Sequence, residues 1–65
     1  MQETFYFRKS AGWPFAMDVV INSDTHRINF LRAMERKRFT QVTEETYLKE
    51  TRIRLLYASM FAKNH

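Results

Sequence analysis

The residues of this chain with the clearest potential for chemistry are five cations in its middle third: Arg27, Arg32, Arg36, Lys37 and Arg38. Guanidinium and ammonium groups contact phosphates, so a cluster of this kind is typical of nucleic-acid binding. Successive residues of a helix lie about 100° apart, however, so the run 36–38 cannot share one face. Cations near the end of a helix also stabilise its dipole. The cluster therefore predicts a solvated helix end, with nucleic-acid contact by region 27–38 as the alternative.

Catalytic and metal-binding chemistry finds little support in the sequence. There are no cysteines, and the two histidines, His26 and His65, have no partners at a spacing typical of a metal site. The acidic residues occupy positions that suit helix caps, helix dipoles and ion pairs, in polar surroundings that give no reason for a raised carboxyl pKa. We therefore predict that the protein is not an enzyme and that it uses no cofactor and no metal.

The last third of the chain carries the strongest pattern. Residues 43–64 read TEETYLKETRIRLLYASMFAKN, without glycine or proline. The first half of this stretch is an amphipathic helix, whereas the LLYASMFA segment is apolar nearly all the way round, and such a helix needs cover on most of its circumference. We expect a second copy or another protein to supply it. The predicted interface residues are Leu55, Leu56, Tyr57, Met60 and Phe61.

Earlier segments indicate the elements that position these groups. A turn at 10–14 holds the only glycine and the only proline, and strand-forming residues flank it at 4–8 and 17–22. A hairpin is the preferred interpretation of residues 1–22, with an extended arm or a helix starting at Pro14 left open. Capping residues at 23–25 and an apolar stripe predict a helix over about 25–38.

Residues 39–42 are then a short connection to a second helix over about 43–63. A short link between helices favours an antiparallel helical hairpin. The predicted fold is a single small domain, residues 1–65, mainly α with a small N-terminal β element (α+β). It is a helical hairpin with a longer C-terminal helix, dimeric through that helix, and an all-α fold is the alternative.

Size and composition support association with partners. A chain of 65 residues buries only about 60% of the surface that its unfolded form exposes, and without disulfides or metal it needs oligomerisation or an unusually apolar core. The composition suits both, with 45% hydrophobic and 15% aromatic residues. No secretory signal and no membrane-spanning stretch can be recognised, so we expect a cytoplasmic protein with no membrane contact.

The chain resembles the small, basic, cysteine-free early proteins of lambda-like temperate phages. The resemblance rests on its short length, the FYFRKSAGWPF opening, the ERKRF cluster and the apolar tail. Such proteins often act by binding host proteins or DNA, so the resemblance implies a regulatory binding protein and assigns no residue a role. The combined prediction is a homo-oligomeric regulator acting through protein–protein contact. The alternative is a small DNA-binding regulator that uses the basic region 27–38.

Overall fold

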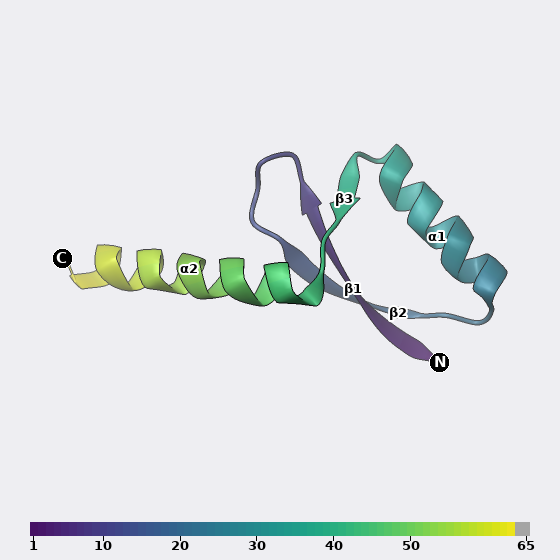
Figure 1. The fold of residues 1–65 in the computed structure, drawn as a ribbon, viewed down its shortest axis with the longest axis horizontal. Helices are drawn as coiled ribbons and strands as arrows, with labels where there is room; N and C mark the ends of the chain where they lie inside the picture. Colours follow the sequence, from purple (N-terminus) through teal and green to yellow (C-terminus); the bar gives the residue numbers. More distant parts are fainter. Residues whose placement is uncertain (64–65) are drawn as a thin grey trace.

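The fold is a three-stranded antiparallel sheet with one helix on each face (Figure 1). The structure is a computed structural model that describes the backbone of residues 1–63 and the side chains of residues 1–60. Along the chain its elements are β1 (Gln2–Lys9), β2 (Phe15–Val20), α1 (Asp24–Arg36), β3 (Phe39–Gln41) and α2 (Glu44–Lys63). The strand order is β2-β1-β3, so β1 is central and both other strands are edges.

This architecture contradicts the predicted helical hairpin and also the all-α alternative. The segment 39–42, predicted as a connection, contains β3, which pairs antiparallel with β1. A strand of three residues is too short to show the alternation that identifies strands in a sequence. Because β3 joins the sheet between the two helices, α1 and α2 lie against opposite faces of the sheet instead of packing on each other.

Residues 1–22 form a β-hairpin, in which Phe5 pairs with Met17 and Phe7 with Phe15. The loop turns where Ser10 takes a positive φ of 54°, and the Gly12 N–H donates to the carbonyl of Lys9 at 3.1 Å. Side chains alternate between the faces of a strand. Phe5 and Phe7 therefore point to the face that α1 covers, while Tyr6 between them points to the other face.

The core lies between α1 and this covered face of the sheet. Its buried members are Phe5, Phe7, Ile21 and Met34, and partly buried residues of β2, α1 and β3 pack around them. Phe30 of α1 sets its ring 5.1 Å from that of Phe5 and 6.0 Å from that of Phe7. Aromatic pairs at such separations stabilise a core beyond the area that they bury. Among the described side chains, the buried core includes none from α2.

Helix α1 has well-defined ends. Ser23 is its N-cap, and its Oγ accepts from the His26 N–H at 3.1 Å, which satisfies one of the free donors of the first turn. At the other end Arg38 adopts a φ of 71°, and its N–H donates to the carbonyl of Glu35 at 2.9 Å. Such a left-handed residue ends the helix and turns the chain into β3.

Helix α2 starts against the sheet and then leaves it. The Thr43 Oγ1 accepts from the Thr46 N–H at 3.1 Å, the Tyr47 ring lies 4.9 Å from the ring of Tyr6, and Glu50 forms an ion pair with Arg8. Beyond these first two turns the helix, here called the outer part of α2 (residues 51–63), projects away from the sheet (Figure 1). The molecule measures 49 × 23 × 18 Å. Across the described part of the chain, no helix is long and apolar enough to cross a membrane.

Candidate interaction surfaces

The outer part of α2 carries the largest set of exposed apolar side chains in the described molecule. Leu55, Leu56, Tyr57 and Met60, all predicted interface residues, are 54–65% exposed. The side chain of Phe61, also predicted, lies outside the described side chains. The structure adds Leu48 and Ile53, which are 56% and 38% exposed. The four predicted interface residues that the structure describes are therefore on the surface of this single chain.

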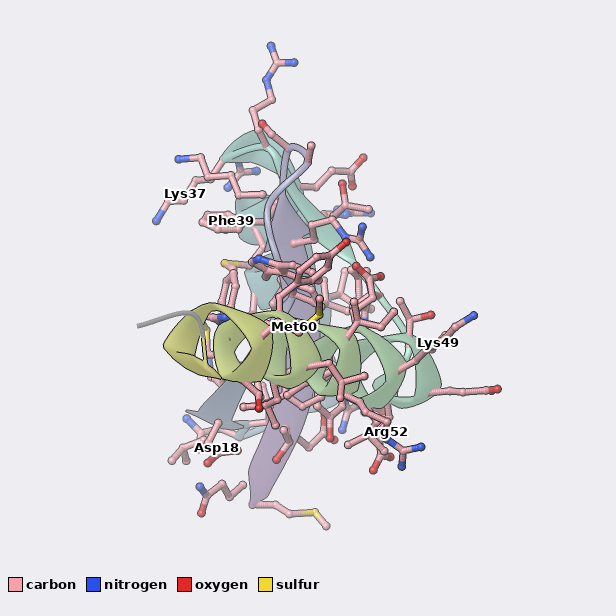
Figure 2. All side chains as sticks on the ribbon, turned by 90° about the vertical axis from the view of Figure 1, so that its left-hand side faces the viewer. Asp18, Lys37, Phe39, Lys49, Arg52 and Met60 are labelled. Atoms are coloured by element: carbon pink, nitrogen blue, oxygen red, sulfur yellow. The ribbon has the colours of Figure 1, made fainter. Side chains whose placement is uncertain are left out.

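The exposed residues of α2 occupy more than one side of the helix. Ile53, Leu56, Tyr57 and Met60 line one shallow hollow of about 330 Å³ with a predominantly apolar surface. Leu48 and Leu55 are seven residues apart, so they share a second side about 140° from the first. Figure 2, which looks along α2 from its outer end, shows Met60, Lys49 and Arg52 projecting from the helix. One flat contact could not cover both sides.

Arg27 differs from the rest of the predicted basic cluster, because its guanidinium is paired with carboxylates of the fold. Its guanidinium forms ion pairs with Glu3 of β1 and with Asp24, the latter at 2.6 Å between Nη1 and Oδ1. Hydrogen bonding to these two carboxylates raises the Arg27 pKa above its usual range, and the same guanidinium lowers the pKa of Glu3. Arg27 therefore links α1 to β1, and its guanidinium is already paired with two carboxylates.

The other four cations are on the surface, and the sheet brings a fifth to them. Arg32, Arg36, Lys37 and Arg38 are exposed and have no ion-pair partner among the described side chains. Lys9 pairs with Phe39 across the sheet, and its Nζ lies 5.4 Å above the Phe39 ring. We call Lys9, Arg36, Lys37 and Arg38 the basic end. Lys37 and Phe39 lie at this end, far from Asp18 (Figure 2).

Sequence reasoning missed Lys9 as a member of the basic end because it missed β3. In the sequence Lys9 is separated from Lys37 by the whole of β2 and α1, and only the β1–β3 pairing brings them to one end. A signal did exist, since Phe39 is an aromatic residue in a segment without helix-forming periodicity, but three residues were too few to identify a strand.

A groove lies between α1 and β3. Leu31 and Glu35 come from α1 and Phe39, Thr40 and Gln41 from β3, with Phe7 of the central strand also lining it. Its volume is about 290 Å³. Ligand pockets usually measure about 300–1,000 Å³, so this groove suits one or two side chains better than a whole cofactor. No pattern along the chain indicates this groove, because its two walls, α1 and β3, meet only in the fold.

The part of the chain that the structure describes contains no cluster of metal-ligating side chains. No three His, Asp or Glu residues there come close enough to hold a metal ion. The His26 Nδ1 accepts from the Asn22 N–H at 3.1 Å, so this imidazole takes part in the turn that precedes α1. His65 lies outside the described residues.

Comparison with known proteins yields no relative for this chain. No protein-family model, no curated protein and no solved structure matches it. The function must therefore be argued from the surfaces themselves, of which three stand out: the outer part of α2, the basic end and the groove between α1 and β3.

Proposed function

We propose that this protein is a non-enzymatic regulatory binding protein that acts by protein–protein contact, with the outer part of α2 as its principal contact surface. The observation that carries the proposal is the exposure of Leu55, Leu56, Tyr57 and Met60 on a helix that projects away from the sheet. Apolar surface of this extent usually marks an interaction site. The resemblance to small phage early proteins supports a regulatory role, and we place that role in the cytoplasm.

A second copy of the chain is the first partner that we propose for α2. Ile53, Leu56 and Met60 follow the alternating spacing of three and four residues that forms the seam of paired helices. The second apolar side of α2 remains available to a further chain.

Sedimentation velocity at micromolar concentrations tests this proposal with two matched variants. Leu56→Asp places a carboxylate in the proposed seam, whereas Leu48→Asp makes the same change at similar exposure on another side of the helix. We expect the wild type and Leu48→Asp to associate, and Leu56→Asp to be a folded monomer. Burying an unpaired carboxylate costs several kcal/mol, which is enough to prevent pairing. A monomeric wild type, or equal dissociation of both variants, would contradict self-association through this seam.

Nucleic-acid binding is the second candidate, because the fold gathers Lys9 with Arg36, Lys37 and Arg38 at one end. The structure changes the residues expected to take part: Lys9 joins the contact and Arg27 leaves it. If duplex DNA binds, Lys9→Gln should reduce the slope of log affinity against log salt by about one, whereas Arg27→Gln should leave the slope unchanged. Absence of salt-dependent duplex binding by the wild type would reject this candidate.

A further inference from the structure

The outer edge of β3 has backbone groups with no partner in the sheet. The Val42 N–H donates to the carbonyl of Tyr6 at 2.9 Å, which makes these two residues a hydrogen-bonded pair. In an antiparallel ladder such pairs alternate with non-bonded ones. Thr40 therefore also faces β1, and the N–H and C=O groups of Phe39 and Gln41 point away from the sheet. A further strand could bond to these groups.

The groove between α1 and β3 lies directly beside this edge. Gln41 and Phe39 line the groove with their side chains, and Leu31 of α1 forms its opposite wall. A strand that paired with β3 would alternate its side chains between the two faces of the sheet. Every second side chain would then enter the groove, where Phe39 and Leu31 contribute apolar surface beside the polar Thr40 and Gln41. The combination of a free edge and an adjoining groove that accepts side chains is typical of proteins that bind extended peptides by strand addition.

The charge around the groove selects the kind of peptide. The basic end contributes Lys9, Arg36, Lys37 and Arg38, and Arg32 lies one turn before Arg36 on α1. Glu35 is the one acidic residue among the residues that line the groove. The lining thus has one acid and no cation, whereas the five cations flank the groove, and carboxylates on an incoming peptide would be attracted to this flank. Arg38 carries one of these positive charges at a backbone φ of 71°, a conformation that favours glycine.

The edge of β2 does not combine these features. The Met1 and Ile21 backbones exchange hydrogen bonds of 2.7 and 3.0 Å, so alternation directs the groups of Ala16, Asp18 and Val20 outward. Asp18 puts a carboxylate on this edge, where its Oδ1 accepts from the Thr4 hydroxyl at 2.6 Å. A charged residue of this kind disfavours strand addition. Strand addition is thus favoured at β3.

We propose that the groove between α1 and β3 binds an extended acidic segment of a partner protein, which adds to β3 as a fourth strand. One large apolar side chain of the segment enters the groove between Leu31 and Phe39. Carboxylates two positions away along the segment share the face of that side chain and meet Lys37 and Arg38 of the basic end. This surface is separate from the outer part of α2, so it can bind a partner whether or not α2 pairs with a second copy.

Amide hydrogen exchange of the full chain tests the proposal directly. The probe is a pool of end-capped heptapeptides with one large apolar residue at the centre and Asp or Glu on both sides, used at about 1 mM, which half-saturates even a millimolar site. In the free protein, the amides of Phe39 and Gln41 should exchange faster than those of Thr40 and Val42, which bond to β1. The peptide pool should slow Phe39 and Gln41 at least about twofold, the factor that half-saturation gives, and leave Thr40 and Val42 unchanged.

Two proline variants separate strand addition from other modes of binding. Gln41→Pro removes an N–H that the sheet does not use, and proline is tolerated on an edge strand in that position. We expect the thermal stability of this variant to match the wild type and peptide protection at Phe39 to disappear. Thr40→Pro removes an N–H that bonds to β1 and should destabilise the sheet. Peptides N-methylated at alternate amides should also fail to protect, because they cannot complete the ladder.

Three results would overturn the proposal. The first is no protection of Phe39 and Gln41 by the peptide pool. The second is protection that survives both Gln41→Pro and peptide N-methylation, since this would place the peptide elsewhere than in a strand at β3. The third is slow exchange of both amides in the free protein at associating concentrations, reversed on dilution, because the edge would then pair with a second copy. Protection by duplex DNA and not by peptide would likewise assign the basic end to nucleic acid.

Discussion

At the scale of single residues, Arg27 and Arg38 have the same side chain but lie in different surroundings. Arg27 bonds to Glu3 and Asp24, and its side chain is about one-third exposed. Arg38 is exposed at a left-handed backbone position. Neighbouring carboxylates decide the difference, because a paired guanidinium stabilises the fold whereas an unpaired one remains available to a partner. Each residue supports a prediction about stability.

Glu3 should make the stability of the protein depend on pH. Its pKa is lowered in the folded state by the hydrogen bond from Arg27, so its stabilising effect is present above the usual glutamate pKa and is lost as pH falls through the lowered value. Glu3→Gln should therefore reduce the urea midpoint at about pH 7 and matter progressively less towards about pH 3. In an Arg27→Gln background the same change should show no such pH dependence, and an unchanged pH dependence there would refute the assignment.

Arg38 should be replaceable by glycine with a gain in stability. A left-handed conformation costs a non-glycine residue roughly 1–2 kcal/mol, part of which is offset by the greater freedom of glycine in the unfolded chain. Arg38→Gly should therefore stabilise the protein by up to about 1 kcal/mol. Arg36→Gly removes a neighbouring charge within α1 and should destabilise it by about 1 kcal/mol. Chemical denaturation of both variants measures the difference, and destabilisation by Arg38→Gly would count against this explanation.

At the scale of elements, the two helices have similar caps but different attachments. Ser23 and Thr43 each accept a hydrogen bond of 3.1 Å from the N–H three residues later. Helix α1 contributes Phe30, Leu31 and Met34 to the core, whereas α2 contacts the sheet through its first two turns. The outer part of α2 can therefore unfold locally while the sheet stays intact.

Removal of the two caps should have correspondingly different effects. Each substitution by alanine removes about 0.5–2 kcal/mol from its helix. Ser23→Ala should lower the global stability by that amount, because α1 unfolds only with the core. Thr43→Ala should accelerate amide exchange throughout α2 and leave the slowest amides of β1 nearly unchanged. Hydrogen exchange distinguishes the two cases. If both variants accelerated the exchange of the β1 amides equally, α2 would be part of the same cooperative unit as the sheet.

At the scale of the whole molecule, folding and association use different parts of the chain. The buried residues Phe5, Phe7, Ile21 and Met34 come from the hairpin and α1, and the exposed apolar residues come from α2. A single chain thus completes its core without the outer part of α2, which supports its availability for a partner. The small size of the core also explains why association would raise the stability of such a chain.

Ending the chain after Glu50 should separate the two roles. This deletion keeps the Tyr6–Tyr47 contact and the Arg8–Glu50 ion pair and removes the outer part of α2. We expect an amide NMR spectrum close to that of the full chain for residues 1–42, together with a monomeric state at every accessible concentration. An unfolded truncated chain would show that the outer part of α2 is needed for the fold, either within one chain or through a second copy.

The local signals of the sequence give good guidance where neighbouring residues decide the structure. The capping residues at 23–25 and the apolar stripe of Ile28, Leu31 and Met34 placed one helix at about 25–38, and the structure has it at Asp24–Arg36. Within that stripe Ile28 is exposed and Met34 is buried. The glycine and proline between the flanking strand-forming segments favoured a hairpin over the arm and the helix, and residues 1–22 form one. Prediction failed at β3, because three residues carry no periodicity and their partner is β1, about thirty residues earlier.

The candidate surfaces divide in the same way. The apolar run in α2 was visible in the sequence because a helix shows its all-round character through its own residues. The basic end and the groove were not, since Lys9 meets Phe39, and Leu31 faces Gln41, only after β3 has joined the sheet. The sequence by itself thus determined the positions of the helices, the hairpin and the apolar tail, all of which depend on short-range spacing. Only the tertiary structure decided which cations are free, which edge is open and what lies beside it, because these depend on pairing between distant segments.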